Sequence, residues 1–271
     1  MRRIPESTKE LLELAYRNYH RERHRNLDPI SLVHRYPKKE DQEVVALFTA
    51  LLSYGNVKTI LQSVERLLKP MGTAPRKFLG TRTNLSLWPG FRHRFTTGAD
   101  IEILAHWVSS ALRSHGTLEN YFMAGQKTVA PALGIKGLLS QFVQSFSSQP
   151  LPLHLEVLKR QRARNLKYLV SDPIQGSACK RLNMFLRWMI RPNDGIDLGL
   201  WTQIHPRELM LPVDTHLLQT LQKLRWTRSK QANWKVVESA TEKLRLAFPE
   251  DPIRYDFALC HLSMSGGSMV E

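Results

Sequence analysis

Apolar residues recur every three or four positions along most of the chain, the spacing that places them on one face of an α-helix. A sustained alternation of apolar and polar residues, which would indicate a half-buried strand, does not occur. The best extended candidate, residues 209–214, is too short to found a sheet. We therefore predict an all-α fold, with helices over residues 9–19, 41–55, 57–68, 100–116, 118–122, 138–146, 154–170, 177–191 and 215–226.

Composition indicates a protein with a real core and a polyanionic partner. Apolar residues make up 42% of the 271 positions, and no internal repeat or low-complexity tract appears, so we expect one structural unit without a flexible linker. The 39 Lys and Arg against 24 Asp and Glu leave a formal charge of +15. This charge favours nucleic acid first and an anionic membrane second. No apolar run is long enough to span a bilayer and no signal-peptide core is present, so we expect a cytoplasmic protein without a membrane partner.

The cysteines and histidines give no sign of a metal site. Two cysteines, Cys179 and Cys260, are too few for a disulfide framework or for the four thiolates of an iron–sulfur cluster. His216 has no second His or Cys at ligand spacing. We expect reduced thiols packed in the core, no metal and no cofactor.

The segment 154–170 is strongly basic on one face and apolar on the other. Two interpretations stay open: a solvated surface helix, or a face that follows the phosphates of a nucleic acid.

A lysine opens one predicted helix. Pro173 and Gly176 mark a tight turn, Ser177 can cap the helix that follows, and Lys180 then falls in its first turn. The positive end of the helix dipole disfavours an ammonium there, and burial would disfavour it further. Both effects favour the neutral amine that a nucleophile must be. The alternative is an ordinary surface lysine beside Arg181.

An aspartate lies at the start of a second predicted helix. Asp214 lies at the N-cap position of a helix whose buried face carries Leu217, Leu218 and Leu221. Taken alone, this pattern predicts a helix cap worth about 1 kcal/mol. Asp256 is expected to cap the last helix in the same way.

Two segments carry a family resemblance. LPVDTH (211–216) and GSACKRLN (176–183) resemble active-site segments of the helix-hairpin-helix DNA glycosylases, the group of endonuclease III and 8-oxoguanine glycosylase. In that family the catalytic aspartate occupies the position of Asp214. The nucleophile is a lysine followed three residues later by Asn or Asp, as Lys180 is followed by Asn183. The chain also resembles an uncharacterised bacterial branch of this superfamily.

Two upstream segments add weaker similarities. Residues 45–67 are similar to the helix, loop and helix that push polar side chains into the DNA stack, with Tyr54, Gly55 and Asn56 in the loop. The run GFRHRF (90–95) resembles the turn before a mid-domain helix of these enzymes.

The resemblance implies a two-lobed helical fold with a cleft between the lobes. Residues 42–190 would form a helical-barrel lobe with the hairpin-like turn, and residues 1–41 and 191–271 the second lobe. It also implies a base-excision repair glycosylase with AP lyase activity, a monomer in the bacterial cytoplasm that associates with the nucleoid. Its partner would be double-stranded DNA with a damaged base or an abasic site.

In the implied mechanism Lys180 attacks the sugar, while Asp214 deprotonates the lysine and stabilises positive charge on the sugar. Tyr54 or Asn56 would fill the gap left by the flipped nucleotide. Backbone N–H groups of the turn would grip a phosphate, and Arg181 with Arg187 would add salt-dependent affinity. The full set of expected DNA-binding residues is Tyr54, Gly55, Asn56, Gly176, Ser177, Ala178, Arg181, Asn183, Thr215 and His216.

The chain departs from the family pattern in three ways. The hairpin keeps only Gly176 of the usual two glycines, and the four-cysteine cluster is absent. Lys180 and Asp214 lie 34 positions apart (180 to 214), farther than in the family, so residues 192–209 are expected to loop out. Two other functions remain open: a noncatalytic nucleic-acid-binding module on the same fold, and a glycosylase or nuclease that needs no lysine.

Overall fold

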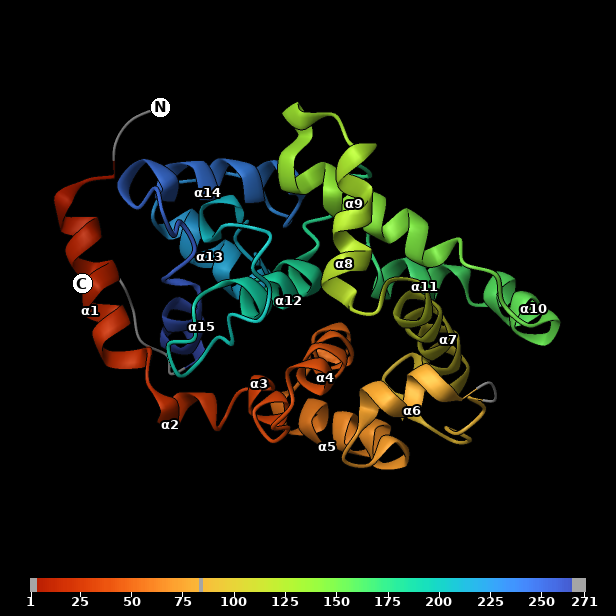
Figure 1. Cartoon of the computed structure of the whole chain (residues 1–271). Coiled ribbons are helices and arrows are strands. Elements are labelled where there is room, and N and C mark those ends of the chain that lie inside the picture. Colours follow the sequence, from red (N-terminus) through yellow and green to blue (C-terminus); the bar gives the residue numbers. More distant parts are fainter. Residues whose placement is uncertain (1–3, 83–84, 265–271) are drawn as a thin grey trace. The chain divides into compact units, whose positions relative to one another are not determined.

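A computed structural model describes residues 4–82 and 85–264 of the chain. Helices dominate these residues, which confirms the all-α prediction (Figure 1). Within this described part, the strands are β1 (Arg92–His93) and β2 (Thr96–Thr97), which pair antiparallel as a small hairpin that begins within GFRHRF (90–95) and ends just after it. Residues 209–214 form no strand. Among the helices described, none combines the length and the apolarity needed to cross a membrane.

The chain divides into two compact units. The central unit is Pro29–Asp172, and the terminal unit joins Met1–Asp28 to Pro173–Glu271. These boundaries differ from the expected ones at 41/42 and 190/191. The helix that begins at Lys180 belongs to the terminal unit. Arg187 in this helix and Arg191 directly after it pair with carboxylates of that unit.

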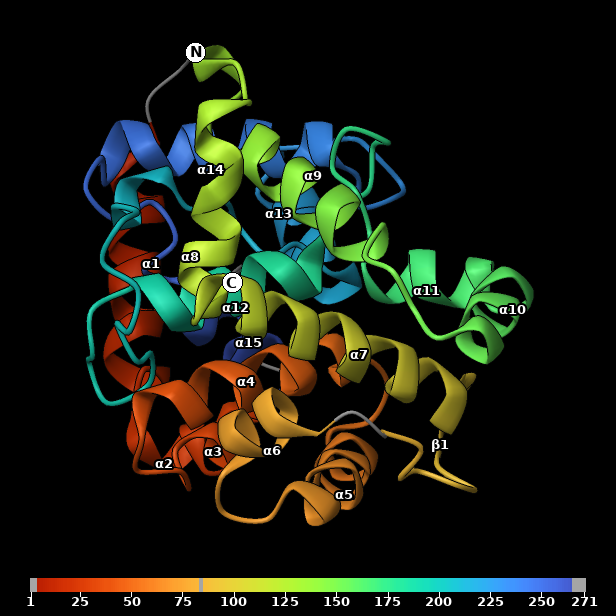
Figure 2. The ribbon, with the colours of Figure 1, turned by 45° about the vertical axis from the view of Figure 1, so that its right-hand side comes forward.

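The central unit is built around α7, which packs on α6 and α8 (Figure 2). Phe48, Trp107, Phe122 and Phe146 are fully buried in its core. Its helices are α3 (Ile30–Val33), α4 (Lys39–Leu52), α5 (Val57–Leu68), α6 (Pro75–Thr81), α7 (Gly98–His115), α8 (Leu118–Met123), α9 (Gly134–Ser147), α10 (Leu153–Gln161) and α11 (Ala163–Leu169). Single 3-10 turns, η1 (Lys69–Met71), η2 (Ala124–Lys127) and η3 (Pro131–Leu133), connect some of them.

The terminal unit draws its helices from both ends of the chain. They are α1 (Glu6–Tyr19), α2 (Glu22–Arg25), α12 (Lys180–Ile190), α13 (Thr215–Lys223), α14 (Trp234–Ala247) and α15 (Asp256–Met264), with the 3-10 turn η4 (Pro206–Glu208). Helix α1 packs along α15. Trp188, Trp201 and Phe257 are core residues, whereas Trp226 is only half-buried.

The helix expected over 154–170 is interrupted. The backbone leaves helical geometry at Arg162 (φ −100°, ψ 8°), which separates α10 from α11. Its guanidinium donates to the buried carboxylate of Asp100 and to the carbonyl oxygen of Phe95. The break therefore lets one residue of a basic segment turn inward and pair.

Candidate active site

The terminal unit brings Lys180 and Asp214 together. The Nζ atom of Lys180 lies 4.0 Å from Oδ2 of Asp214, and each side chain is 28% exposed. Lys180 is the first residue of α12, and Asp214 is the N-cap of α13. Two helix N-termini thus present an amine and a carboxylate to each other at a solvent-accessible point.

The two oxygens of Asp214 have separate tasks. Oδ1 accepts a hydrogen bond of 2.9 Å from the backbone N–H of Leu217, which confirms the predicted cap. Oδ2 is the oxygen that lies near the lysine. Because capping fixes the carboxylate, its second oxygen is oriented towards the amine before any substrate binds.

The capping role predicts a difference between two variants of this residue. Asp214→Ala should lower the free energy of unfolding by about 1 kcal/mol, because it removes the cap, whereas Asp214→Asn should keep the cap and the stability. Urea denaturation of both variants measures the difference. An Asn variant as unstable as the Ala variant would contradict the capping role.

A tight turn sets the position of Lys180. Gly176 has a positive φ of 87°, and its N–H donates to the carbonyl oxygen of Pro173 at 3.0 Å. Ser177 is not the N-cap that was predicted: its Oγ accepts from the N–H of Cys179 inside the turn, at 3.2 Å. The helix begins at Lys180, two residues later than a Ser177 cap would place it, after Cys179 in the left-handed conformation (φ 47°). A non-glycine residue in that conformation is strained, so surrounding contacts must hold it.

Two anchors hold the turn. The N–H of Trp234, at the start of α14, donates to the carbonyl oxygen of Gly176 at 3.0 Å, next to a bridge between Ser177 and Asn233. From the other side, Nδ2 of Asn183 donates to the carbonyl oxygen of Ala178 at 3.1 Å. These contacts orient the first residue of α12.

The anchors correct part of the predicted DNA-binding set. Asn183 is 1% exposed, so its side chain does not face a ligand. Ala178 was expected to contribute its backbone N–H, and that expectation stays a prediction. The N–H of Gly176 is already used within the turn, which removes it from the expected phosphate grip. Thr215 and His216 are exposed, and Ser177 and Arg181 are partly exposed, so these four remain available at the surface.

The other three predicted residues belong to the central unit. Tyr54 is held in place: its hydroxyl donates to the carbonyl oxygen of His93 at 3.0 Å and bonds the hydroxyl of Thr96 at 2.6 Å. A side chain fixed in this way is not free to fill a gap in DNA, which corrects its predicted role. Gly55 has a φ of 99°, and Asn56 caps α5 while staying exposed.

Arg187 was predicted to add surface charge, and this prediction is wrong. Its side chain is 4% exposed and pairs with Asp197 at 3.0 Å and with Asp256. Asp256 therefore begins α15 as half of a buried ion pair rather than as a simple cap. One feature of the sequence could have indicated the buried position of Arg187. Lys180, Asn183 and Arg187 follow i, i+3, i+7 spacing, so these polar residues share one face of α12.

The long connection from α12 to α13 packs inward rather than looping out. Arg191 pairs with Asp194 at 3.1 Å, with Asp251 at 2.9 Å and with Asp197. Backbone N–H groups of residues 198 and 201 donate to carbonyl oxygens of α12 at 2.9 and 2.8 Å. The connection therefore supplies Asp194 and Asp197 to the buried guanidinium groups of Arg187 and Arg191.

Two groups of this cluster have pKa values shifted in the direction that favours their charged forms. Burial alone would lower the pKa of Arg187, but the carboxylates of Asp197 and Asp256 raise it. Burial alone would raise the pKa of Asp194, but a hydrogen bond from His20 and the charge of Arg191 hold it well below its usual value. These groups are therefore charged at neutral pH.

Cys260 shares the electrostatic environment of the pair. Burial raises the pKa of its thiol to about 12, although the charge of Lys180 acts in the opposite direction. The thiol is therefore neutral at physiological pH and does not compete as a nucleophile. Cys179 is buried, and both cysteines are free. Within the described residues, no group of three or more His, Cys, Asp and Glu side chains is arranged to hold a metal ion.

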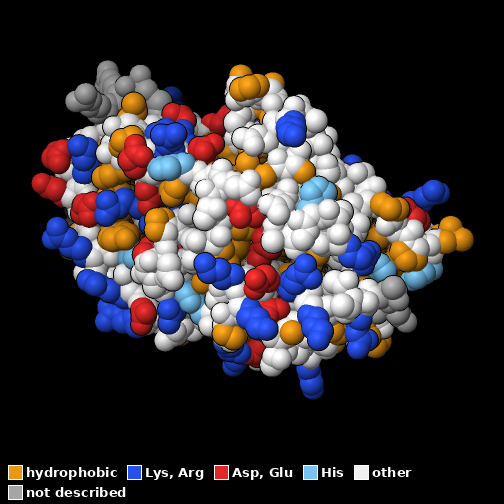
Figure 3. Space-filling model, viewed as in Figure 1, with side chains coloured by type: hydrophobic (Ala, Val, Ile, Leu, Met, Phe, Trp, Pro, Cys, Tyr) orange, Lys and Arg blue, Asp and Glu red, His pale blue; other side chains and the backbone are white. Residues whose placement is uncertain are grey.

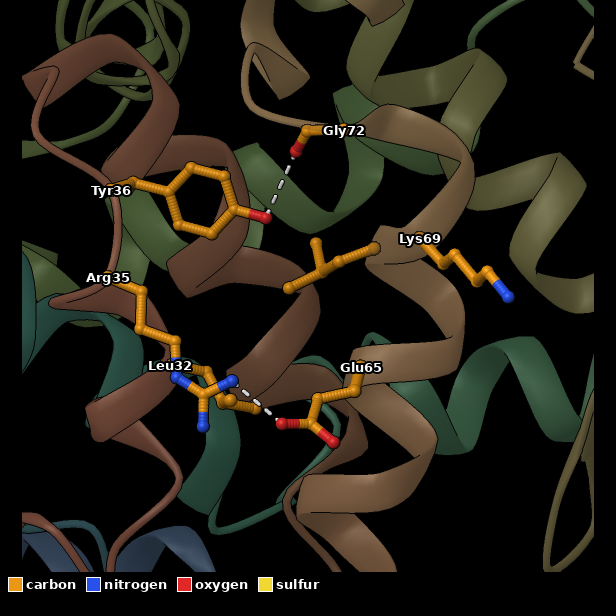
Figure 4. A pocket seen from close by; sticks show the side chains of 7 residues that line it. Leu32, Arg35, Tyr36, Glu65, Lys69 and Gly72 are labelled. Atoms are coloured by element: carbon orange, nitrogen blue, oxygen red, sulfur yellow. Dashed lines mark hydrogen bonds and ion pairs between the residues drawn. The ribbon is translucent and has the colours of Figure 1, made fainter.

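A separate small pocket lies in the central unit between α3, α5 and η1 (Figure 4). Its volume is about 240 Å³. Arg35 pairs with Glu65 at 2.7 Å across its mouth, and the hydroxyl of Tyr36 donates to the carbonyl oxygen of Gly72. Because these polar groups satisfy one another, the pocket presents no evident group for chemistry. Its lining residues are Leu32, Arg35, Tyr36, Glu65, Leu68, Lys69 and Gly72.

Comparison with known proteins identifies one family. The profile described as "Protein of unknown function (DUF2400)" matches residues 28–265, which include Lys180, Asp214 and the whole central unit. No curated protein and no solved structure gives a significant match.

Proposed function

The chain belongs to the DUF2400 family, whose function is unknown, and we propose from its candidate site that it is a DNA glycosylase with AP lyase activity. The observation that carries the proposal is the separation of 4.0 Å between Nζ of Lys180 and Oδ2 of Asp214, with both side chains partly exposed. These are the two positions that resemble the nucleophile and the aspartate of the helix-hairpin-helix glycosylases.

The pair has the groups that the reaction requires. With a nucleotide flipped out of the duplex, the amine of Lys180 attacks C1′ as the bond from C1′ to the base nitrogen breaks. Asp214 takes the proton that the ammonium must first lose and passes it to the departing base nitrogen. The carboxylate that results again carries a negative charge, which stabilises the positive charge on the sugar. The bond from C1′ to O4′ then breaks as O4′ takes a proton from the attached nitrogen, which opens the sugar ring and gives the protonated imine. The imine acidifies C2′, so that loss of a C2′ proton breaks the bond from C3′ to its phosphate oxygen by β-elimination. No cofactor enters these steps.

A separation of 4.0 Å is longer than a hydrogen bond, so a small rotation of the lysine or one water has to complete the proton transfer. Ligand-free catalytic contacts are commonly loose in this way. The anchored turn limits how far Lys180 can move, which favours a repeatable geometry.

Charge and fold class support a DNA partner. The chain carries a net charge of +15, and Figure 3 shows Lys and Arg side chains at many points of the surface. Such a surface attracts the phosphate backbone in a salt-dependent way. We propose a fold of the helix-hairpin-helix glycosylase type and a monomer that acts on damaged or abasic double-stranded DNA in the cytoplasm, at the nucleoid.

The direct test is reductive trapping. We expect sodium borohydride to link the protein covalently to a duplex with one abasic site, because it reduces the imine to a stable amine. A panel of duplexes with oxidised bases then reports whether base removal precedes the lyase step. Absence of an adduct on every lesion would overturn the proposal in favour of a noncatalytic DNA-binding module or a lysine-independent enzyme.

A further inference from the structure

Three aromatic rings of the central unit form a surface cluster at the β1–β2 hairpin. We name Tyr54, Phe95 and Tyr168 the aromatic platform. Tyr54 and Phe95 are stacked, with ring centroids 5.1 Å apart and planes inclined by 22°. Tyr168 stands perpendicular to both, 4.7 Å from Phe95 and 5.3 Å from Tyr54. Phe95 remains 39% exposed and Tyr168 43% exposed, which is unusual for large aromatic side chains that already have partners.

The distances show which face of Phe95 is covered within the platform. If Tyr168 lay over the face of Phe95 opposite Tyr54, the centroid distance between Tyr168 and Tyr54 would approach the sum of the other two centroid distances. That distance is instead about equal to each of the other two, so Tyr168 lies beside the stacked pair. The face of Phe95 that points away from Tyr54 is therefore covered by neither ring.

The backbone beneath the exposed ring is fixed. The carbonyl oxygen of Phe95 accepts hydrogen bonds from Arg162 at 2.8 Å and from Nδ2 of Asn165 at 3.0 Å. Arg162 is in turn locked by the fully buried Asp100. Since the hairpin and α11 are tied together here, a ligand that stacks on Phe95 meets a preorganised surface.

The surroundings of the platform are cationic. Arg92 and Arg94 flank Phe95 in the hairpin, while Arg164 and Lys167 lie beside Tyr168 on α11, and all four are exposed. Residues 85–99 and 157–171 contain no Asp or Glu. Of the carboxylates that border these two segments, Asp100 is buried and already paired, Asp172 is buried, and Glu156 pairs with Lys159 at 3.8 Å. An exposed aromatic surface on two basic segments matches a flat base attached to a phosphate backbone.

We propose that the aromatic platform stacks one unpaired base of single-stranded DNA on the open face of Phe95, with the neighbouring cations on its phosphates. Insertion between paired bases requires both faces of a ring, whereas one covered face and one open face suit a single stacked base. The site lies in the central unit and does not rest on the proposed chemistry at Lys180. The proposal adds unpaired nucleotides as a second feature of the DNA substrate.

Fluorescence anisotropy with two probes tests the platform: an oligo(dT) of about 12 nucleotides, and a blunt duplex of the same length. We expect Phe95→Ala to weaken oligo(dT) binding roughly 5- to 100-fold and duplex binding by less than about twofold, because stacking acts only on unpaired bases. Phe95→Trp should keep the affinity. Leu133→Ala, which trims another exposed apolar side chain of the central unit (44% exposed), should leave both affinities unchanged.

Each alternative result is decisive. Equal weakening of both probes by Phe95→Ala would overturn the stacking role and indicate a general contact with DNA, and no weakening of either would exclude the platform as a DNA site. Failure of Phe95→Trp to retain binding would also contradict stacking. Repeating the titrations with Lys180→Gln keeps the test independent of the lyase proposal, since that variant should still distinguish the two probes.

Discussion

Lys180→Gln is expected to lower the rate of strand cleavage at an abasic site by about 1000-fold or more, and to abolish borohydride trapping. The size of the effect follows from the role of the residue: without the amine there is no imine, and removal of a nucleophile leaves only the catalysis that binding and orientation supply. Single-turnover cleavage of an end-labelled abasic duplex measures the rate. DNA affinity should change little, because only one charge is lost from a surface with net charge +15.

Lys223→Gln is the matched control. It removes the same charge from the exposed end of α13 in the same unit, without touching the pair. We expect its cleavage rate to stay within about twofold of the unsubstituted protein. A Lys180→Gln variant that cleaves as fast as the Lys223→Gln variant would remove the lysine from the mechanism.

Arg187→Met is expected to lower the free energy of unfolding by about 3–5 kcal/mol, the cost of breaking a buried ion pair by removing one partner. Its guanidinium is 4% exposed and bonds Asp197 and Asp256, whose side chains are 0% and 7% exposed. Asp197 keeps Arg191, but Asp256 is left as a buried carboxylate without its arginine. Urea unfolding followed by circular dichroism measures the loss.

Two further variants serve as comparisons for Arg187→Met. Arg35→Met breaks a pair whose side chains are 60% and 49% exposed, and it should cost less than about 1 kcal/mol. Adding Asp256→Asn to Arg187→Met should recover part of the lost stability, because the unpaired charge is then gone. A loss below about 1 kcal/mol for Arg187→Met alone would show that the buried cluster is not structural.

Local patterns in the sequence were enough to place one helix of the central unit and one residue of the candidate site. Helix α5 spans the predicted residues 57–68, and Asp214 caps its helix as the spacing indicated. Both features depend on short-range geometry: helical periodicity and a side chain that reaches a backbone N–H three residues away.

Features that depend on long-range pairing were missed. Arg187 and Arg191 look like surface cations in a basic chain, and only the folded unit brings Asp197, Asp251 and Asp256 to them. The same holds for Tyr54, whose partners His93 and Thr96 come from a hairpin about 40 residues later. A single sequence shows on which face of a helix a polar residue lies, but not which residue it pairs with in the folded protein. The buried Arg187 was therefore predicted to be an exposed charge.

The central claim is that the amine of Lys180 forms the covalent bond to DNA, and mass spectrometry of the reduced adduct tests it most directly. After borohydride trapping, nuclease digestion and proteolysis, we predict a sugar remnant on the peptide that contains Lys180 and on no other peptide. A remnant on a different lysine or on the N-terminal amine, with Lys180 unmodified, would contradict the account.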